Sequence, residues 1–206
     1  MKKFFLIIFL FLASCGQNFK NDDLKKSYIF SDEMTFDEFR LKVEEYAKNI
    51  QQKKLVIQDG KQTERDSTGC FFTNDWLQKD LANVINETNK VCNWNFKLTK
   101  FEDFQYTSYD KKQHYNWHTD THSKPYADGM MRKVSFSLLL NDNFKGGEFA
   151  ICEAHPDSNK SVVHRFDNVK PGTIIVFYSG LWHKVYPIKS GIRKSLVGWT
   201  LGPMFQ

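Results

Sequence analysis

Two segments of this 206-residue chain carry side chains that could bind one metal ion. In the first segment His118 and Asp120 are two positions apart, and two such residues in a strand point to the same side. In the second segment His183 lies near the start of another predicted strand. Two histidines and a carboxylate on one face of an octahedron are typical of non-haem Fe(II) oxygenases. The H-x-D pair alone is a weak signal, because a surface turn with a hydrogen-bonded histidine contains the same residues.

A positively charged residue follows His183 at a spacing that would bring its side chain close to the metal ligands. Arg193 comes ten residues after His183, behind a predicted turn at Ser190-Gly191. A hairpin of this length would return the guanidinium to the barrel that holds His183. The planar fork of Arg binds a carboxylate through two parallel hydrogen bonds, and Ser195, on the same strand face, could add a hydroxyl. The pattern therefore indicates a carboxylate-binding group near the metal ligands.

The elements that would position these residues follow from the hydrophobic periodicity. A capping-type start at Ser31-Asp32-Glu33 precedes a predicted helix over 35–49, and the same spacing predicts a second helix over 75–90. Alternating apolar and polar residues predict strands over 94–98, 102–109, 132–140, 147–152, 161–166, 173–178, 182–187 and 193–201. Many short strands behind a pair of helices predict a mostly β fold with supporting helices and a double-stranded β-helix (jelly roll) core.

Further segments occur in the order of a known family. Tyr109 and Tyr115 precede the H-x-D pair, Gly146-Gly147-Glu148-Phe149 forms a glycine turn, Pro171-Gly172 opens a strand, and Trp199 follows Arg193. Together with the two metal-site segments, they resemble the prolyl 4-hydroxylase-like branch of the 2-oxoglutarate/Fe(II) dioxygenases. The resemblance covers residues 28–202, so it includes most of the chain.

The resemblance implies a role for each site residue. His118, Asp120 and His183 would ligate Fe(II), while Arg193, helped by Ser195, would bind the distal carboxylate of 2-oxoglutarate. Many relatives also use a tyrosine where this chain reads Ser137-Leu138-Leu139. Tyr109 or Tyr115 could take its place in the co-substrate pocket. Trp199 would pack near the iron, and residues 124–131 would form either a lid or a plain surface connection. His114 and His122 are expected to be exposed or to hydrogen-bond behind the ligands.

The function implied is a dioxygenase that depends on Fe(II), 2-oxoglutarate and O2. It would hydroxylate a C–H bond of a peptidyl proline, another protein side chain or a small molecule, releasing succinate and CO2, with L-ascorbate keeping the iron reduced. One alternative is a cupin-like metal-binding module or isomerase that does not use 2-oxoglutarate, and the presence and spacing of Arg193 disfavour it. Another is a non-catalytic surface lipoprotein, in which an intact set of four site residues would be a coincidence.

The N-terminus has the pattern of an export signal. Lys2 and Lys3 precede an apolar run that ends in Leu12-Ala13-Ser14-Cys15, which resembles a bacterial lipobox. We expect residues 1–15 to be a signal peptide whose Cys15 is lipidated, 16–27 to be a polar linker, and 28–206 to be the dioxygenase domain. The protein would then be exported or membrane-anchored; the alternative is a cytoplasmic enzyme with a retained leader.

Charge and cysteine content narrow the remaining classes of function. The formal charge of +5 is modest and the basic residues are scattered, which gives no support for nucleic-acid binding. The four cysteines contain no C-x-x-C pair, which disfavours a zinc site or a disulfide framework. The partner expected from the sequence is therefore a protein or small-molecule substrate.

Overall fold

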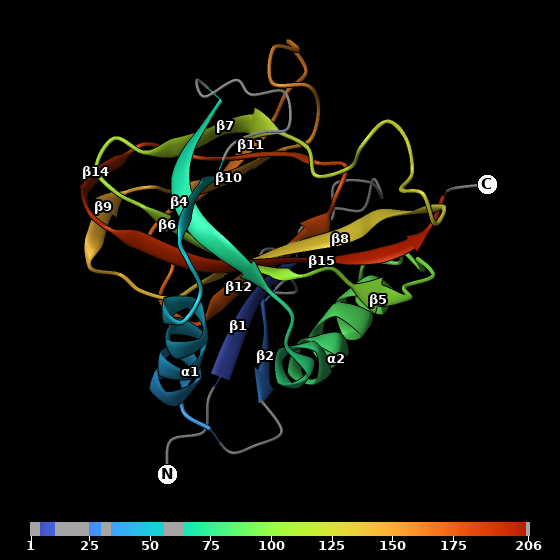
Figure 1. Ribbon diagram of the computed structural model, residues 1–206. Coiled ribbons are helices and arrows are strands. Elements are labelled where there is room, and N and C mark those ends of the chain that lie inside the picture. The colour runs from blue at the N-terminus through green and yellow to red at the C-terminus, as the bar shows by residue number, and fades with distance from the viewer. Residues whose placement is uncertain (1–4, 11–24, 30–33, 56–63, 205–206) are drawn as a thin grey trace.

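The structure is a computed structural model and describes residues 5–10, 25–29, 34–55 and 64–204 (Figure 1). These residues form two helices and fifteen strands. The helices are α1 (Phe36–Lys48) and α2 (Asp75–Val91). The strands are β1 (Phe5–Leu10), β2 (Lys25–Ile29), β3 (Lys53–Leu55), β4 (Arg65–Phe72), β5 (Lys100–Phe101), β6 (Phe104–Tyr109), β7 (His114–His118), β8 (Met130–Leu139), β9 (Phe144–Gly146), β10 (Phe149–Cys152), β11 (Val163–Phe166), β12 (Thr173–Tyr178), β13 (Trp182–Val185), β14 (Ile188–Gly191) and β15 (Arg193–Pro203).

Both predicted helices are present, but the first begins at a different cap. The side chain of Thr35 accepts a hydrogen bond from the backbone N–H of Glu38, whose carboxylate in turn accepts from the Thr35 backbone. This reciprocal pair satisfies two N–H groups at the helix start, so the prediction of a cap at Ser31-Asp32-Glu33, outside the described residues, was wrong. Asn74 caps α2 through the N–H of Leu77.

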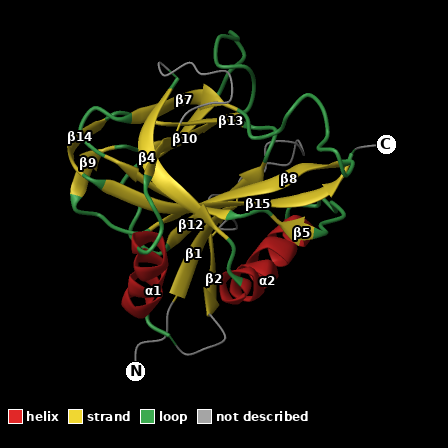
Figure 2. Cartoon of the chain, viewed as in Figure 1, coloured by secondary structure: helices red, strands yellow, loops and turns green. Residues whose placement is uncertain are grey.

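The strands curl into two facing antiparallel layers, which confirms the predicted jelly roll. The larger layer contains the order β6-β15-β8-β12, and the smaller one contains β7-β13-β10-β11. β4 pairs with β6 of the larger layer and with β7 of the smaller one, so it links them at one edge. Both helices lie against the outer face of the larger layer (Figure 2).

The side chains of β8 alternate between the two faces of the larger layer, and these faces have different surroundings. Val134, Phe136 and Leu138 are fully buried in the hydrophobic cluster that contains the helices. Between them, Ser135 and Ser137 point to the opposite face, toward the space between the layers. A second hydrophobic cluster fills part of that space; its buried members are Tyr109, Phe149, Ile151, Ile175, Phe177, Leu181, Val185 and Ile188. The interior therefore combines an apolar core with a polar region.

Two predictions about strands were wrong, and one predicted strand is present but shorter than expected. Residues 94–98 form no strand, because Asn93 and Asn95 adopt positive φ and the side chain of Asn89 bonds the backbone N–H and C=O of Phe96. The strand predicted over 182–187 ends at Val185, just before the Tyr186-Pro187 pair. β13 and β15 form no hairpin together either, since they lie in different layers.

β4 was not predicted from the sequence. Its sequence, RDSTGCFF, shows no clean alternation of apolar and polar residues and contains a glycine. Gly69 is required there, since a Cβ at this position would lie 2.1 Å from the carbonyl oxygen of Tyr106 on the neighbouring β6. The close approach of the two backbones favours glycine over the residues that usually mark a strand.

The N-terminal segment pairs with the edge of the larger layer. β1 runs parallel to β12, and β2 pairs with β1 in the antiparallel sense. Residues 25–27 of the predicted linker belong to β2, whereas 16–24 and the lipobox with Cys15 lie outside the described residues. Among the described residues, no helix has both the length and the apolar character needed to cross a bilayer. The predicted signal peptide stays a prediction.

Candidate metal centre

The three predicted metal ligands converge on one place. His118 ends β7, His183 lies in β13, and the two residues are direct cross-strand partners. Asp120 does not lie in the same strand as His118, as the sequence suggested, because β7 ends at His118. Its backbone N–H instead donates to the carbonyl of Ser179 at 2.9 Å, which turns its carboxylate toward the histidines. One ligand atom from each residue lies within 4.8 Å of the others.

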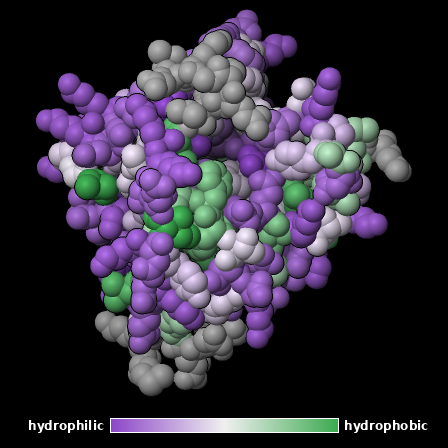
Figure 3. All heavy atoms as spheres, in the orientation of Figure 1, coloured by the Kyte–Doolittle hydropathy of each residue, from purple (hydrophilic) through white to green (hydrophobic). Residues whose placement is uncertain are grey.

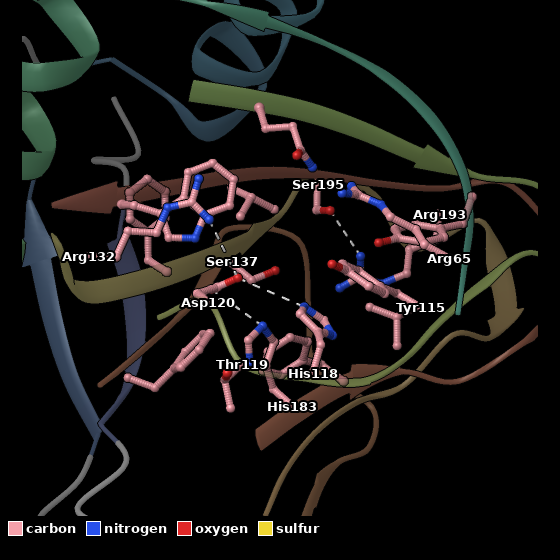
Figure 4. Close-up of a pocket in the computed structure, with 18 of the residues that line it drawn as sticks. Arg65, Tyr115, His118, Thr119, Asp120, Arg132, Ser137, His183, Arg193 and Ser195 are labelled. Carbon is pink, nitrogen blue, oxygen red and sulfur yellow. Dashed lines mark hydrogen bonds and ion pairs between the residues drawn. The ribbon is translucent and has the colours of Figure 1, made fainter. Parts of the chain in front are cut away.

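Each imidazole is oriented by a main-chain carbonyl. Nδ1 of His118 lies 2.7 Å from the carbonyl oxygen of Asn116, and Nδ1 of His183 lies 2.9 Å from that of Leu181. Nδ1 must carry the proton to donate there, which leaves the lone pair of each Nε2 for a metal. The Nε2 atoms lie 3.9 Å (His118) and 3.4 Å (His183) from the Asp120 carboxylate (Figure 4).

Burial and neighbouring charges favour the protonation states that a metal needs. Burial, followed by the nearby His183, holds the pKa of His118 well below its usual value. Burial also acts to raise the pKa of Asp120, but His183, His118 and Arg132 lower it to about 2. At neutral pH the group therefore offers an ionised carboxylate and a neutral His118 imidazole. Two imidazoles and one carboxylate suit Fe(II), so the residues present fit that metal.

The cavity also holds the predicted carboxylate-binding arginine. Arg193 is 3% exposed, and its Nη1 donates to the hydroxyl of Ser195 at 3.0 Å. Burial lowers the pKa of Arg193. Its guanidinium carbon lies 5.9 Å from the ring centre of Tyr109. Among the described residues, no carboxylate lies within ion-pair distance of Arg193, so its buried charge has no acidic partner there.

The glycine turn predicted from the family resemblance makes room for that arginine. Gly147 has φ +66°, and a Cβ there would lie 2.2 Å from Cδ1 of Ile188 and 3.1 Å from Cδ of Arg193. A side chain at this position would therefore displace the arginine and strain the backbone.

One cavity of about 460 Å³ contains both groups. Its lining includes the predicted residues His118, Asp120, His183, Arg193, Ser195, Tyr109, Tyr115, Ser137 and Trp199. Tyr115 stacks on the ring of His118 with 3.4 Å between centres, and its burial contributes most to raising its pKa to about 12. His122 also lines the cavity, but neither it nor His114 belongs to the metal-binding group.

The structure adds a charged network that the sequence did not reveal. Arg132 lies 4.0 Å from the Asp120 carboxylate and makes a 2.6 Å ion pair with Glu102. The hydroxyl of Tyr126 donates to the same Glu102 at 2.7 Å. Together with the 2.8 Å ion pair between Lys100 and Asp128, this contact ties the segment 124–131 to residues 100–102. No local sequence pattern predicts this network, because its members come from separate elements.

Comparison with known families agrees with this geometry. The sequence model of the 2OG-Fe(II) oxygenase superfamily matches residues 104–201, which contain all three metal ligands and Arg193. Residues 104–201 thus have the sequence pattern of the 2OG-Fe(II) oxygenase superfamily. The match begins at β6 and ends in β15, so it spans both layers of the jelly roll.

Curated relatives include PKHD-type hydroxylases. The chain is 31% identical over 125 residues to one from Crocosphaera subtropica, covering 58% of this chain and 52% of that protein. It is 33% identical over 89 residues to one from Synechococcus sp. (strain CC9902), covering 41% of this chain and 35% of that protein. The chain thus matches about half or less of the length of these relatives.

Solved structures of the superfamily share the fold. A Pseudomonas putida prolyl-4-hydroxylase aligns with a TM-score of 0.58 at 20% identity, covering 84% of this chain and 89% of that one. A Trichoplax adhaerens prolyl hydroxylase, solved with a hypoxia inducible factor oxygen degradation domain peptide, aligns with a TM-score of 0.53 at 19% identity, covering 79% and 74%.

Proposed function

We propose that this protein is an Fe(II)- and 2-oxoglutarate-dependent hydroxylase of the PKHD or prolyl 4-hydroxylase type. The observation that carries the proposal is one cavity with His118, Asp120 and His183 at one end and, at the other, a buried Arg193 that has no acidic partner among the described residues. A metal alone would need only the first group. An elongated dianion that reaches from the metal to the arginine would use both.

The ligand set defines what the site would hold. His118, Asp120 and His183 would bind Fe(II) and leave three of six octahedral positions open. When bound, the metal with 2-oxoglutarate and O2 supplies the oxidation that places a hydroxyl group on a C–H bond and yields succinate and CO2.

The other cavity residues would orient the co-substrate and limit water. The fork of Arg193 would bind the distal carboxylate, and the hydroxyl that Ser195 contributes already holds one of its nitrogens. Tyr115, Phe177 and Trp199 line the walls next to the ligands, and such apolar surfaces keep water from reactive groups. The stretch Ser137-Leu138-Leu139 lacks the tyrosine that the family resemblance implies for the co-substrate pocket, and of the two candidates Tyr109 and Tyr115 we choose Tyr109, whose ring lies 5.9 Å from the Arg193 guanidinium carbon.

The test is turnover combined with binding. Purified without oxygen, the protein should bind one Fe(II) and one 2-oxoglutarate, and with oxygen it should release succinate and CO2, with ascorbate prolonging the reaction. A cupin-like module would bind the metal without 2-oxoglutarate, and a non-catalytic lipoprotein would bind neither. The substrate we propose is a peptidyl proline, another protein side chain or a small molecule; a hydroxylated product identified by mass spectrometry would distinguish these.

We also propose that the protein is exported and attached to a membrane through lipid on Cys15. The support is the sequence pattern of Lys2-Lys3, the apolar run and Leu12-Ala13-Ser14-Cys15. Two acyl chains on one cysteine are what stable anchoring generally needs. Cleavage before Cys15 would remove β1, which pairs at the edge of the larger layer.

Labelling with palmitate checks this location. The wild-type protein should carry the label and sediment with membranes, and Cys15→Ser should lose both properties. Cys70→Ser serves as the control, because that buried thiol is part of the hydrophobic core. Soluble, unlabelled wild-type protein that keeps residues 1–15 would contradict the lipid anchor and leave the proposed chemistry untouched.

A further inference from the structure

A second buried arginine lines the same cavity. Arg65 opens β4, is 8% exposed and is the register partner of Tyr115 on β7. Its guanidinium carbon lies 4.5 Å from the centre of the Tyr115 ring, which itself stacks on His118. Arg65 therefore lies in the wall of the cavity, with the Tyr115 ring between it and the metal ligand His118. It lies outside residues 104–201, which the superfamily model matches.

Among the described residues, one hydrogen-bond acceptor contacts this guanidinium. Nε of Arg65 donates to the hydroxyl of Ser67 at 3.0 Å. Among the described residues, no carboxylate lies within ion-pair distance of Arg65, and the adjacent Asp66 pairs with Lys54 instead. The two terminal nitrogens of Arg65 thus remain available for a planar anion.

With Fe(II) and 2-oxoglutarate bound, the other charges of the cavity would balance one another and leave the positive charge of Arg65 uncompensated. Glu102 neutralises Arg132. The two positive charges of Fe(II) and the one on Arg193 equal the negative charges of Asp120 and the two carboxylates of 2-oxoglutarate. Arg65 is then the one remaining charged group among the described residues that line the cavity. Because a buried charge without a partner is costly, this residue calls for one more negative charge.

Arg65 and Arg193 have different surroundings. Arg193 lies on β15 with Ser195 and the ring of Tyr109, whereas Arg65 lies on β4 with Ser67 and the ring of Tyr115. After burial and stronger neighbours, the charge of Arg65 helps to lower the pKa of His118. Burial lowers the pKa of Arg193, and its guanidinium carbon lies 5.9 Å from the ring centre of Tyr109.

The strand that carries Arg65 also reaches the surface. Phe71 lies on the same face of β4, lines the cavity and is 48% exposed. In the space-filling view hydrophilic residues cover most of the face shown, and hydrophobic residues form a patch near its centre (Figure 3). A molecule that entered along β4 would pass an aromatic ring before it met the arginine.

We propose that Arg65 binds a carboxylate of the substrate, so that the substrate is an acid rather than a neutral molecule. This inference rests on the proposed function, because it assumes that Fe(II) and 2-oxoglutarate occupy the rest of the cavity. The carboxylate could belong to an acidic side chain of a peptide or to a free small acid. Both present the same planar anion to the guanidinium fork.

Matched acid and amide probes test the proposal without turnover. Protein loaded with Mn(II) and 2-oxoglutarate, without oxygen, is titrated with N-acetyl-prolyl-glutamate against N-acetyl-prolyl-glutamine, both with amidated C-termini, and with proline against prolinamide. The first pair represents an acidic peptide and the second a free acid. In at least one pair the acid should bind roughly 10- to 100-fold more tightly, as expected for charge-assisted hydrogen bonds.

Variants assign that preference to a residue. Arg65→Gln should remove the difference between acid and amide while the affinity for 2-oxoglutarate changes less than about twofold. Arg65→Lys should keep part of the preference, since it retains the charge but not the fork. Arg40→Gln, on the surface of α1, is the matched control, and thermal melting of each variant checks that it is folded.

Three results would overturn this inference without affecting the proposed function. If neither pair shows a preference for the acid in the wild-type protein, an acidic substrate is excluded. A preference that persists in folded Arg65→Gln would assign the anion to another residue. A loss of 2-oxoglutarate affinity as large as that in Arg193→Ala would make Arg65 part of the co-substrate site. If the wild-type protein binds neither Mn(II) nor 2-oxoglutarate, the proposed function fails together with this inference.

Discussion

The two ends of the cavity differ in how far the protein satisfies its own polar groups (Figure 4). At the metal end each histidine donates Nδ1–H to a main-chain carbonyl, and the ionised Asp120 has the Arg132 guanidinium 4.0 Å away. At the other end, Arg193 has a single hydroxyl as its hydrogen-bond partner, and no acid pairs with it among the described residues. The protein thus orients the metal ligands itself, whereas the charge of the arginine is left for a ligand to neutralise.

The two ends also differ in where their residues come from. The metal ligands lie on one cross-strand pair, His118 and His183, and on the turn directly after it. The arginine end draws on β15 and β6 of one layer and on the glycine turn between β9 and β10. Removing ligands at the metal end should therefore abolish metal binding. Removing a residue at the arginine end should only weaken the binding of 2-oxoglutarate, because one of several contacts is lost.

The largest effect is expected from removing two metal ligands. The double variant Asp120→Ala, His183→Ala leaves only one imidazole, so Fe(II) occupancy measured after anaerobic loading should fall to roughly a tenth of the wild-type value or less. His114→Ala is the control, because His114 lies outside the metal-binding group. Near-stoichiometric iron in the double variant would mean that the metal binds elsewhere.

This end of the cavity was largely predictable from the sequence. The residue types and their spacing identify His118, Asp120 and His183, because few other groups of side chains suit Fe(II). The sequence did not show how the geometry arises. Asp120 is held by a backbone hydrogen bond to Ser179, a residue far away in the chain, and not by the strand periodicity that pointed to it.

A smaller but still large effect is expected at Arg193. Arg193→Ala leaves a buried carboxylate of 2-oxoglutarate unpaired, which costs about 2–5 kcal/mol, and the dissociation constant should rise accordingly. Arg193→Lys should recover only part of the affinity, because an ammonium group cannot make the two-point contact. Metal affinity should stay near the wild-type value in both variants. Unchanged binding of 2-oxoglutarate, measured by titration of the Mn(II)-loaded Arg193→Ala protein, would show that another residue anchors it.

The residues at the arginine end of the cavity were harder to predict from the sequence. Arg193 could be found from its spacing after His183, although the predicted hairpin was wrong. Arg65 could not, because β4 lacks a regular apolar pattern and reaches the cavity only through its pairing with both layers. Strand pairings between distant segments decide such positions, and a local pattern carries no information about them.

The smallest of the three effects concerns the network behind Asp120, which links the metal end to the segment 124–131. Glu102 binds Arg132 through Nε at 3.0 Å and 3.1 Å and through Nη2 at 2.6 Å. While this pair holds, the guanidinium stays 4.0 Å from Asp120. Glu102→Gln removes the charge that attracts Arg132, so the guanidinium should move toward Asp120 and compete with the metal for its oxygens.

We therefore expect Glu102→Gln to weaken Mn(II) or Fe(II) binding by about tenfold, in the range typical of residues behind metal ligands. At saturating metal, the affinity for 2-oxoglutarate should hardly change, which separates this effect from the one at Arg193. Glu44→Gln is the matched control, since it also breaks an ion pair, at 3.0 Å with Lys194, but does not line the cavity. Equal metal affinity in Glu102→Gln and Glu44→Gln, measured by calorimetry, would show that Asp120 is held in place without Arg132 and that the metal end is complete on its own.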